Sequence, residues 1–236
     1  MTCIQHTPCV CRAEQGQFTP NRGGWGTRPG NQLVVKCRLN SMQLCAITDR
    51  KRSTQPLSVL VEGWSTTGVH YIQLREKDLD AAALLSLARE VVAKIDRSRT
   101  QLLVNVSTPE SATLALAAGA GGVHLAGKPR AGAASRVRQA FRDAIISVPC
   151  HNLEDIYVAS QEQVDLILFS PVFEKISGTA LAQGLEGLRL ACVAAQAIPV
   201  FALGGVTAAN AQDCVAAGAA GIAGIRLFAG DDWRRL

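Results

Sequence analysis

Charged and amide side chains gather at the end of one apolar run, Tyr71-Ile72-Gln73-Leu74-Arg75-Glu76-Lys77. An apolar strand that becomes polar only at its carboxyl tip is typical of a parallel sheet covered by helices, where ligands bind at such tips. Arg75 and Lys77 are two positions apart, so on a strand they project to the same side. Together they suit a phosphate or a carboxylate. The alternative is a solvated strand end in which Glu76 forms an ordinary ion pair.

Glycines after two later apolar runs predict a phosphate site. Gly204 and Gly205 end the first run, and Ile225 and Arg226 end the second. Barrels frequently bind phosphate with backbone amides from the loops after strands seven and eight. Glycine favours this because it has no Cβ to hold the backbone away from the anion. The alternative is a tight turn into a helix capped by Thr207.

Among the histidines, His151 is the candidate for proton transfer. It follows a predicted strand and precedes Asn152, which suits the N-cap of a helix. A histidine in that place can move protons near neutral pH, although it can equally be a hydrogen-bonded structural residue. His124 is flanked by apolar residues and is expected in the barrel core. His70 begins a strand and so lies at the wrong end for catalysis.

The elements that must position these residues alternate along the chain. Short β-rich runs are separated by longer Ala- and Leu-rich runs of helical spacing. The predicted strands are Leu44–Thr48, Val69–Leu74, Gln101–Asn105, Gly122–Leu125, Ala144–Val148, Leu166–Phe169, Pro199–Leu203 and Gly221–Ile225. This pattern predicts an α/β protein, a single (β/α)8 TIM barrel of minimal size over residues 42–236. The polar strand tips should then converge on one mouth.

The first forty-one residues are expected to form an irregular extension. Of the formal net charge of +5 over 236 residues, this stretch carries most, and without it 19 basic residues face 18 acidic ones. Nothing therefore indicates nucleic acid as a partner. The stretch has turn-like glycines and prolines and no apolar periodicity. We hypothesise that it is a mis-called start and that Met42 is the initiator, which N-terminal mass spectrometry of the native protein would test.

The sequence also bears on the compartment. No run approaches the ~18 consecutive apolar residues of a membrane span, so no membrane partner is expected. Single cysteines among apolar residues are typical of reduced, buried thiols. No targeting signal is recognised, so the expected location is cytoplasmic. The oligomeric state is left open, and an oligomer is compatible with the sequence.

The chain resembles the thiamine phosphate synthase/TenI family over nearly all of residues 43–228. The resemblance implies the (β/α)8 fold, a thiazole phosphate ligand and a place in thiamine biosynthesis. It rests on Ala46-Ile47-Thr48-Asp49, Gln73-Leu74-Arg75-Glu76-Lys77, Gly122-Val123-His124-Leu125, Cys150-His151-Asn152, Ser170-Pro171-Val172-Phe173, Ala202-Leu203-Gly204-Gly205-Val206 and Gly221-Ile222-Ala223-Gly224-Ile225.

Departures from the family pattern bear on which of its two activities to expect. The synthase couples a pyrimidine pyrophosphate to a thiazole phosphate with Mg²⁺ held by carboxylates. In their places stand Asn105-Val106 and Ala126-Gly127-Lys128-Pro129, and Mg²⁺ prefers oxygen ligands. Pro149 replaces a serine before the strand-five histidine. The pyrophosphate loop reads Glu174-Lys175-Ile176-Ser177-Gly178-Thr179.

What remains resembles TenI proteins, which are tautomerases that aromatise thiazole phosphate carboxylate with a histidine and no metal. We therefore expect a tautomerase acting on a small phosphorylated thiazole without a cofactor. Two alternatives stay open, namely the Mg²⁺-dependent synthase and a non-catalytic regulator that binds thiazole phosphate. His151 is the predicted catalytic residue, and the predicted substrate-binding residues are Gln73, Arg75, Lys77, Asn105, Gly204, Gly205, Ile225 and Arg226. Arg226 would bind the phosphate or remain solvated.

Overall fold

The computed structural model describes residues 42–53, 55–174 and 181–236 of the chain. The predicted irregular extension, residues 1–41, lies outside the described residues, and so does the hypothesis about Met42 as the initiator. Most of the loop in which the pyrophosphate-binding motif was sought, residues 175–180 with Lys175, also lies outside them.

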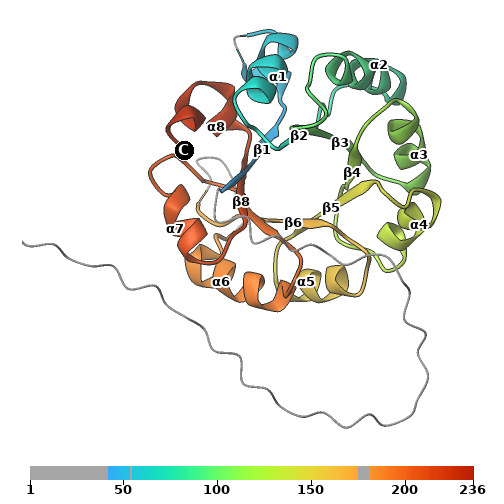
Figure 1. Ribbon diagram of the computed structural model, residues 1–236. Coiled ribbons are helices and arrows are strands. Elements are labelled where there is room, and N and C mark those ends of the chain that lie inside the picture. The colour runs from blue at the N-terminus through green and yellow to red at the C-terminus, as the bar shows by residue number, and fades with distance from the viewer. Residues whose placement is uncertain (1–41, 54, 175–180) are drawn as a thin grey trace, which may run out of the picture. The chain divides into compact units, whose positions relative to one another are not determined.

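Eight parallel strands form a closed barrel, as the alternating pattern predicts (Figure 1). Each strand pairs with its neighbours in chain order, and β1 closes the barrel by pairing with β8, with Ala46 opposite Gly224. The strands are β1 Gln43–Ile47, β2 Tyr71–Leu74, β3 Gln101–Val106, β4 Gly122–Leu125, β5 Ile145–Cys150, β6 Leu166–Phe169, β7 Val200–Ala202 and β8 Gly221–Gly224. Every predicted strand is confirmed, with bounds that differ by at most two residues.

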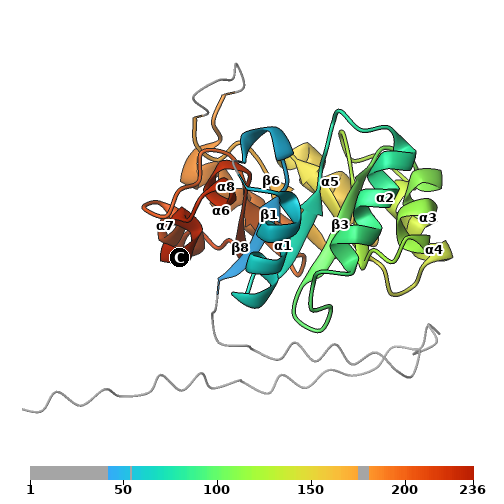
Figure 2. The same ribbon diagram turned by 90° about the horizontal axis from the view of Figure 1, so that it is seen from above.

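Helices follow the strands and cover the outside of the barrel (Figures 1 and 2). They are α1 Leu57–Thr66, α2 Ala81–Val92, α3 Pro109–Ala117, α4 Ala133–Ala140, α5 Leu153–Ser160, α6 Gly184–Ala195, α7 Ala211–Ala216 and α8 Arg226–Ala229, with short 3-10 helices η1 Arg50–Arg52 and η2 Asp232–Arg235. The final helix is short, because the chain passes from α8 into η2 after a few residues.

Side chains alternate between two cores along each strand, as the pleat of a β-strand requires. One set, which includes Ala46, Ile72, Val104 and Ile146, packs outward against the helices. The other set fills the barrel interior with Cys45, Ile47, Leu103, Leu166, Leu168, Phe201 and Ala223. Residues in register with this inner set therefore point into the barrel interior, and near the carboxyl end these include Gln73 and Asn105.

Local capping signals account for several helix starts. Asp80 begins α2 by accepting a hydrogen bond from the Ala83 amide at 2.8 Å. Asn152 caps α5 in the same way, as predicted. Thr207 does not cap α7, however, so the alternative interpretation of the glycine pair as a turn capped by Thr207 is not confirmed. The helix begins at Ala211, because the Asn210 side chain accepts from the Thr207 amide at 2.8 Å and keeps the preceding residues in a loop.

Three of the four described cysteines are buried free thiols, as predicted. They are Cys45, Cys150 and Cys214. Cys192 on α6 is only partly buried, so the prediction of burial is wrong for that residue. Burial raises the pKa of the Cys45 thiol to about 12. Among the described residues, no helix is long and apolar enough to cross a membrane.

Candidate active site

An amide pair lies inside the carboxyl end of the barrel. Gln73 on β2 is 2% exposed, and its Nε2 donates to Asn105 Oδ1 on β3 at 3.2 Å. Among the residues that the structure describes, no group donates to Gln73 Oε1. A buried polar atom without a partner costs free energy, so this oxygen is suited to a polar group of a ligand. The structure thus brings together two predicted substrate-binding residues from neighbouring strands.

Arg75 follows β2 directly, two residues after Gln73. Its amide donates to Thr48 Oγ1 at 3.0 Å, and its side chain is half-buried. Its positive charge adds, after burial, to the lowering of the pKa of His124. Lys77 is exposed and lies in the turn after the strand, since β2 ends at Leu74. The alternation of a strand therefore does not fix the direction of Lys77, contrary to expectation.

The ion pair of the alternative interpretation, within the Arg75-Glu76-Lys77 motif, is not formed. Glu76 instead pairs with Arg50, whose Nε lies 3.2 Å from Glu76 Oε2. Within the described parts of the chain, neither Arg75 nor Lys77 pairs with a carboxylate. Both cations are thus available to an anionic ligand.

His151 stands at the tip of β5 and is held at two points. Its amide donates to Asp155 Oδ2 at 2.8 Å, and its Nδ1 lies 2.6 Å from the Ser170 carbonyl oxygen. A carbonyl only accepts, so Nδ1 carries a hydrogen and the Nε2 lone pair of the neutral ring remains available. No described residue donates to Nε2. The imidazole is exposed at the mouth, where it can take up a proton from a bound ligand.

His124 belongs to the barrel core, as predicted. It is 5% exposed, and its Nδ1 lies 2.9 Å from Ser147 Oγ. Burial, with a smaller effect from the Arg75 charge, lowers the pKa of His124 to about 3. The ring is therefore neutral near pH 7 and is unsuited to exchange protons there.

The loop after β7 is shaped by its two glycines. Gly204 and Gly205 have φ values of +94° and +67°. The Gly204 carbonyl accepts from the Phe173 amide at 2.9 Å, so the loop after β6 lies directly against it. A Cβ on Gly205 would lie 2.6 Å from Phe173 Cβ. Asn210 fixes the other side of the loop, since its Nδ2 donates to the Gly205 carbonyl at 3.1 Å.

Free backbone amides gather at the tips of β7 and β8. Among the described residues, no acceptor is found for the amides of Gly204, Gly205 and Ile225. The two strands are neighbours, and Ile225 directly precedes α8. Free N–H groups beside the start of a helix suit a phosphate. Arg226, the first residue of α8, is exposed, and no described carboxylate pairs with it.

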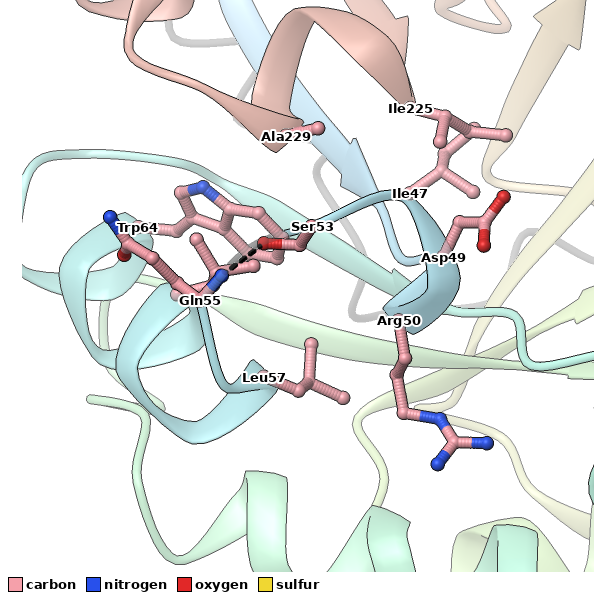
Figure 3. Close-up of a pocket in the computed structure, with 10 residues that line it drawn as sticks. Ile47, Asp49, Arg50, Ser53, Gln55, Leu57, Trp64, Ile225 and Ala229 are labelled. Carbon is pink, nitrogen blue, oxygen red and sulfur yellow. Dashed lines mark hydrogen bonds between the residues drawn. The ribbon is translucent and has the colours of Figure 1, made fainter.

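A small hollow lies beside this loop, between the turn after β1 and the start of α8 (Figure 3). Leu57 and Trp64 of α1 line its apolar side, and Asp49 lies at the rim close to Ile225. Figure 3 shows the Arg50 guanidinium directed away from Ile225. The hollow therefore adjoins Ile225, one of the residues predicted to hold phosphate.

The carboxylates near the strand tips do not fit a protein-held Mg²⁺. Asp49 pairs with Arg52 at 2.9 Å, Glu76 pairs with Arg50, and Asp78 pairs with Arg50 at 3.1 Å. Hard cations need several free oxygen ligands, and these are already occupied by cations. Over the described residues, no group of three or more His, Cys, Asp or Glu side chains could hold a metal.

Three supporting contacts were not foreseen from the sequence. The Ser170 carbonyl orients His151, Asp155 holds the His151 amide, and Asn210 holds the glycine loop. The spacing of Asp155 three residues after the Asn152 cap is a recognisable helix-start signal, and an Asn soon after Gly-Gly is a loop signal. The Ser170 carbonyl has no such signal, because any residue supplies one.

Comparisons with known proteins agree with this architecture. The family model described as thiamine monophosphate synthase matches residues 44–228. A putative thiamine-phosphate synthase of Geobacter sulfurreducens is 40% identical over 190 residues, covering 80% of this chain and 87% of its own. The putative thiamine-phosphate synthase 2 of Aquifex aeolicus is 38% identical over 188 residues, covering 79% of this chain and 97% of its own.

A solved structure shares the fold. Thiamine phosphate pyrophosphorylase from Pyrococcus furiosus superimposes with a TM-score of 0.69 at 26% identity, covering 82% of this chain and 91% of that one. The match to the family model spans the barrel strands that carry the glycine loop and the Gln73-to-Lys77 motif. By the family model and by these relatives, the chain belongs to the thiamine monophosphate synthase family.

Proposed function

We propose that this family member is a thiazole tautomerase that aromatises thiazole phosphate carboxylate without a protein-bound metal. One observation carries the proposal. His151 donates through Nδ1 to the Ser170 carbonyl at 2.6 Å, so Nε2 of the neutral ring is the free, basic nitrogen at the barrel mouth. This arrangement suits a general base that later returns the proton as a general acid.

The proton transfers proposed for His151 need no other reactant. Aromatisation by tautomerisation removes one proton from a ring carbon and returns one proton elsewhere in the conjugated system. No atom is lost and no oxidant is needed. A single imidazole can perform both steps, because its conjugate acid forms in the first step and is consumed in the second.

The remaining predicted residues would bind and orient the substrate. The amides of Gly204, Gly205 and Ile225 would donate hydrogen bonds to the phosphate, and Arg75 and Lys77 would pair with the ring carboxylate. Gln73 would contact the heterocycle through its unpartnered Oε1, beside its hydrogen-bond partner Asn105. Arg226, at the start of α8, could add a charge-assisted bond to the phosphate. Binding at both ends would hold the ring in one orientation relative to His151.

A second candidate is the synthase itself, which would join a pyrimidine pyrophosphate to a thiazole phosphate. The names of the Geobacter sulfurreducens and Aquifex aeolicus relatives favour it. So do the retained cations, which could stabilise a departing pyrophosphate. The carboxylates available do not fit Mg²⁺, so this reading requires the substrates and water to supply the metal's ligands. A non-catalytic binder of thiazole phosphate is the third possibility.

The test is the full chain, freed of metal, incubated with the non-aromatic thiazole phosphate carboxylate and followed by NMR. We expect wild type to form the aromatic product and His151→Ala to be slower by about 10²–10⁴-fold. Affinity for the aromatic thiazole phosphate should be nearly unchanged in the variant, since the phosphate contacts lie on other strands.

The possible outcomes separate the three candidates. Equal rates for wild type and His151→Ala would refute the role of His151. No aromatisation, but formation of thiamine phosphate once Mg²⁺ and pyrimidine pyrophosphate are added, would establish the synthase. Binding of thiazole phosphate without either reaction would support the non-catalytic regulator.

A further inference from the structure

Glu76 is a buried charge that the proposed chemistry does not use. Its side chain is 2% exposed, although it stands between the half-buried Arg75 and the exposed Lys77. A carboxylate so buried is costly unless its oxygens are paired. The structure satisfies it with one residue, because Arg50 donates from its amide to both Glu76 oxygens at 3.2 and 3.3 Å. Arg50 Nε adds a third contact at 3.2 Å.

These contacts join two strand tips that flank the mouth. Arg50 begins η1, the turn after β1, and Glu76 follows β2. The same two tips are joined again one residue earlier, where the Arg75 amide donates to Thr48 Oγ1 at 3.0 Å. Two contacts thus fix the backbone of Arg75. One is the hydrogen bond of its own amide to Thr48, and the other is the pairing of the adjacent Glu76 side chain with Arg50.

The pairing also decides which cations remain available. Arg50 is occupied by Glu76 and by Asp78, and its guanidinium is directed away from Asp49 and Ile225 (Figure 3). Arg75, by contrast, is half-buried at the tip of β2 and is paired with no described carboxylate. Glu76 therefore pairs with the Arg50 side chain, whereas the Arg75 side chain remains unpaired.

We propose that Glu76 is a positioning residue that holds Arg75 in register with the substrate carboxylate without touching the substrate. The inference rests on the proposed function in one respect, which is that Arg75 binds that carboxylate. Its consequence is selectivity. Loss of Glu76 should lower the affinity for ligands that carry the ring carboxylate. It should leave the affinity for ligands that carry only the phosphate unchanged.

Calorimetric binding to the full chain tests this with two stable probes, the aromatic thiazole phosphate carboxylate and the same compound without the carboxylate. We expect wild type to prefer the carboxylated probe and Glu76→Ala to lose about tenfold of that preference. Glu76→Gln, whose amide oxygen can still accept from the Arg50 amide, should lose less. Asp78→Asn is the matched control, because it removes an exposed pair to the same arginine and should keep the preference.

Three results with Glu76→Ala would overturn the inference. The first is an unchanged preference for the carboxylated probe. The second is an equal loss of affinity for both probes at an unaltered melting temperature. The third is stronger binding of the carboxylated probe through a released Arg50. A wild type that binds both probes with equal affinity would also overturn the inference, since Arg75 would then not bind the ring carboxylate. Because turnover is not measured, a chain that shows the preference but aromatises nothing would refute only the proposed function.

Discussion

Gly205 offers the sharpest test of how the phosphate loop is built. Replacement by alanine would place a side chain on a residue with φ of +67°, a conformation that L-residues adopt at a cost of about 1–2 kcal/mol. The new Cβ would also lie 2.6 Å from Phe173 Cβ and 2.9 Å from the Glu174 carbonyl oxygen. The loop after β6 would have to move away from the loop after β7.

The expected loss is the sum of two effects. Overpacking of a close contact costs about 1–3 kcal/mol. Together with the backbone conformation, Gly205→Ala should lower the free energy of unfolding by about 2–5 kcal/mol. The movement should also disturb the free amides of Gly204 and Gly205, so affinity for inorganic phosphate should fall.

Urea unfolding monitored by circular dichroism, with phosphate binding by calorimetry, measures both effects. Gly68→Ala is the matched control, because Gly68 has φ of +98° but a Cβ there would meet nothing within 4 Å. It should lose only about 1–2 kcal/mol and should bind phosphate normally. Equal destabilisation of the two variants, or unaltered phosphate binding by Gly205→Ala, would refute the close packing described for the loop.

Two further predictions concern buried polar groups. The pKa of His124, lowered from 6.5 to about 3, means that the unfolded chain takes up a proton before the native one as the pH falls. Stability should therefore be lost below pH 6.5 by up to about 1.4 kcal/mol per pH unit, and His124→Gln should show a shallower pH dependence of urea unfolding; parallel curves would contradict this. Asn210→Ala removes the bonds to the Thr207 amide and the Gly205 carbonyl, so calorimetry should show roughly tenfold weaker binding of inorganic phosphate. If Asn210→Asp, which keeps only the acceptor, binds phosphate like wild type, the contact to Gly205 is unimportant.

The strands and their order were predictable because their signals are local. Gly122–Leu125 and Leu166–Phe169 have the predicted bounds, since each is a short apolar run bounded by turn residues. Alternation of such runs with helical ones leaves few topologies, of which the closed parallel barrel is one. The Asn152 cap of α5 was predictable for the same reason, because a cap acts on amides only a few residues away.

The partners of the polar residues were decided by tertiary structure. Glu76 has oppositely charged neighbours in sequence, yet it pairs with Arg50, 26 residues away. The free nitrogen of His151 is known only because the barrel brings β6, with the Ser170 carbonyl, beside β5. The sequence alone thus determined the strands and the strand ends at which these polar residues lie. Which of them remain free to bind or react depended on strand register, because register brings together groups that are distant in the chain.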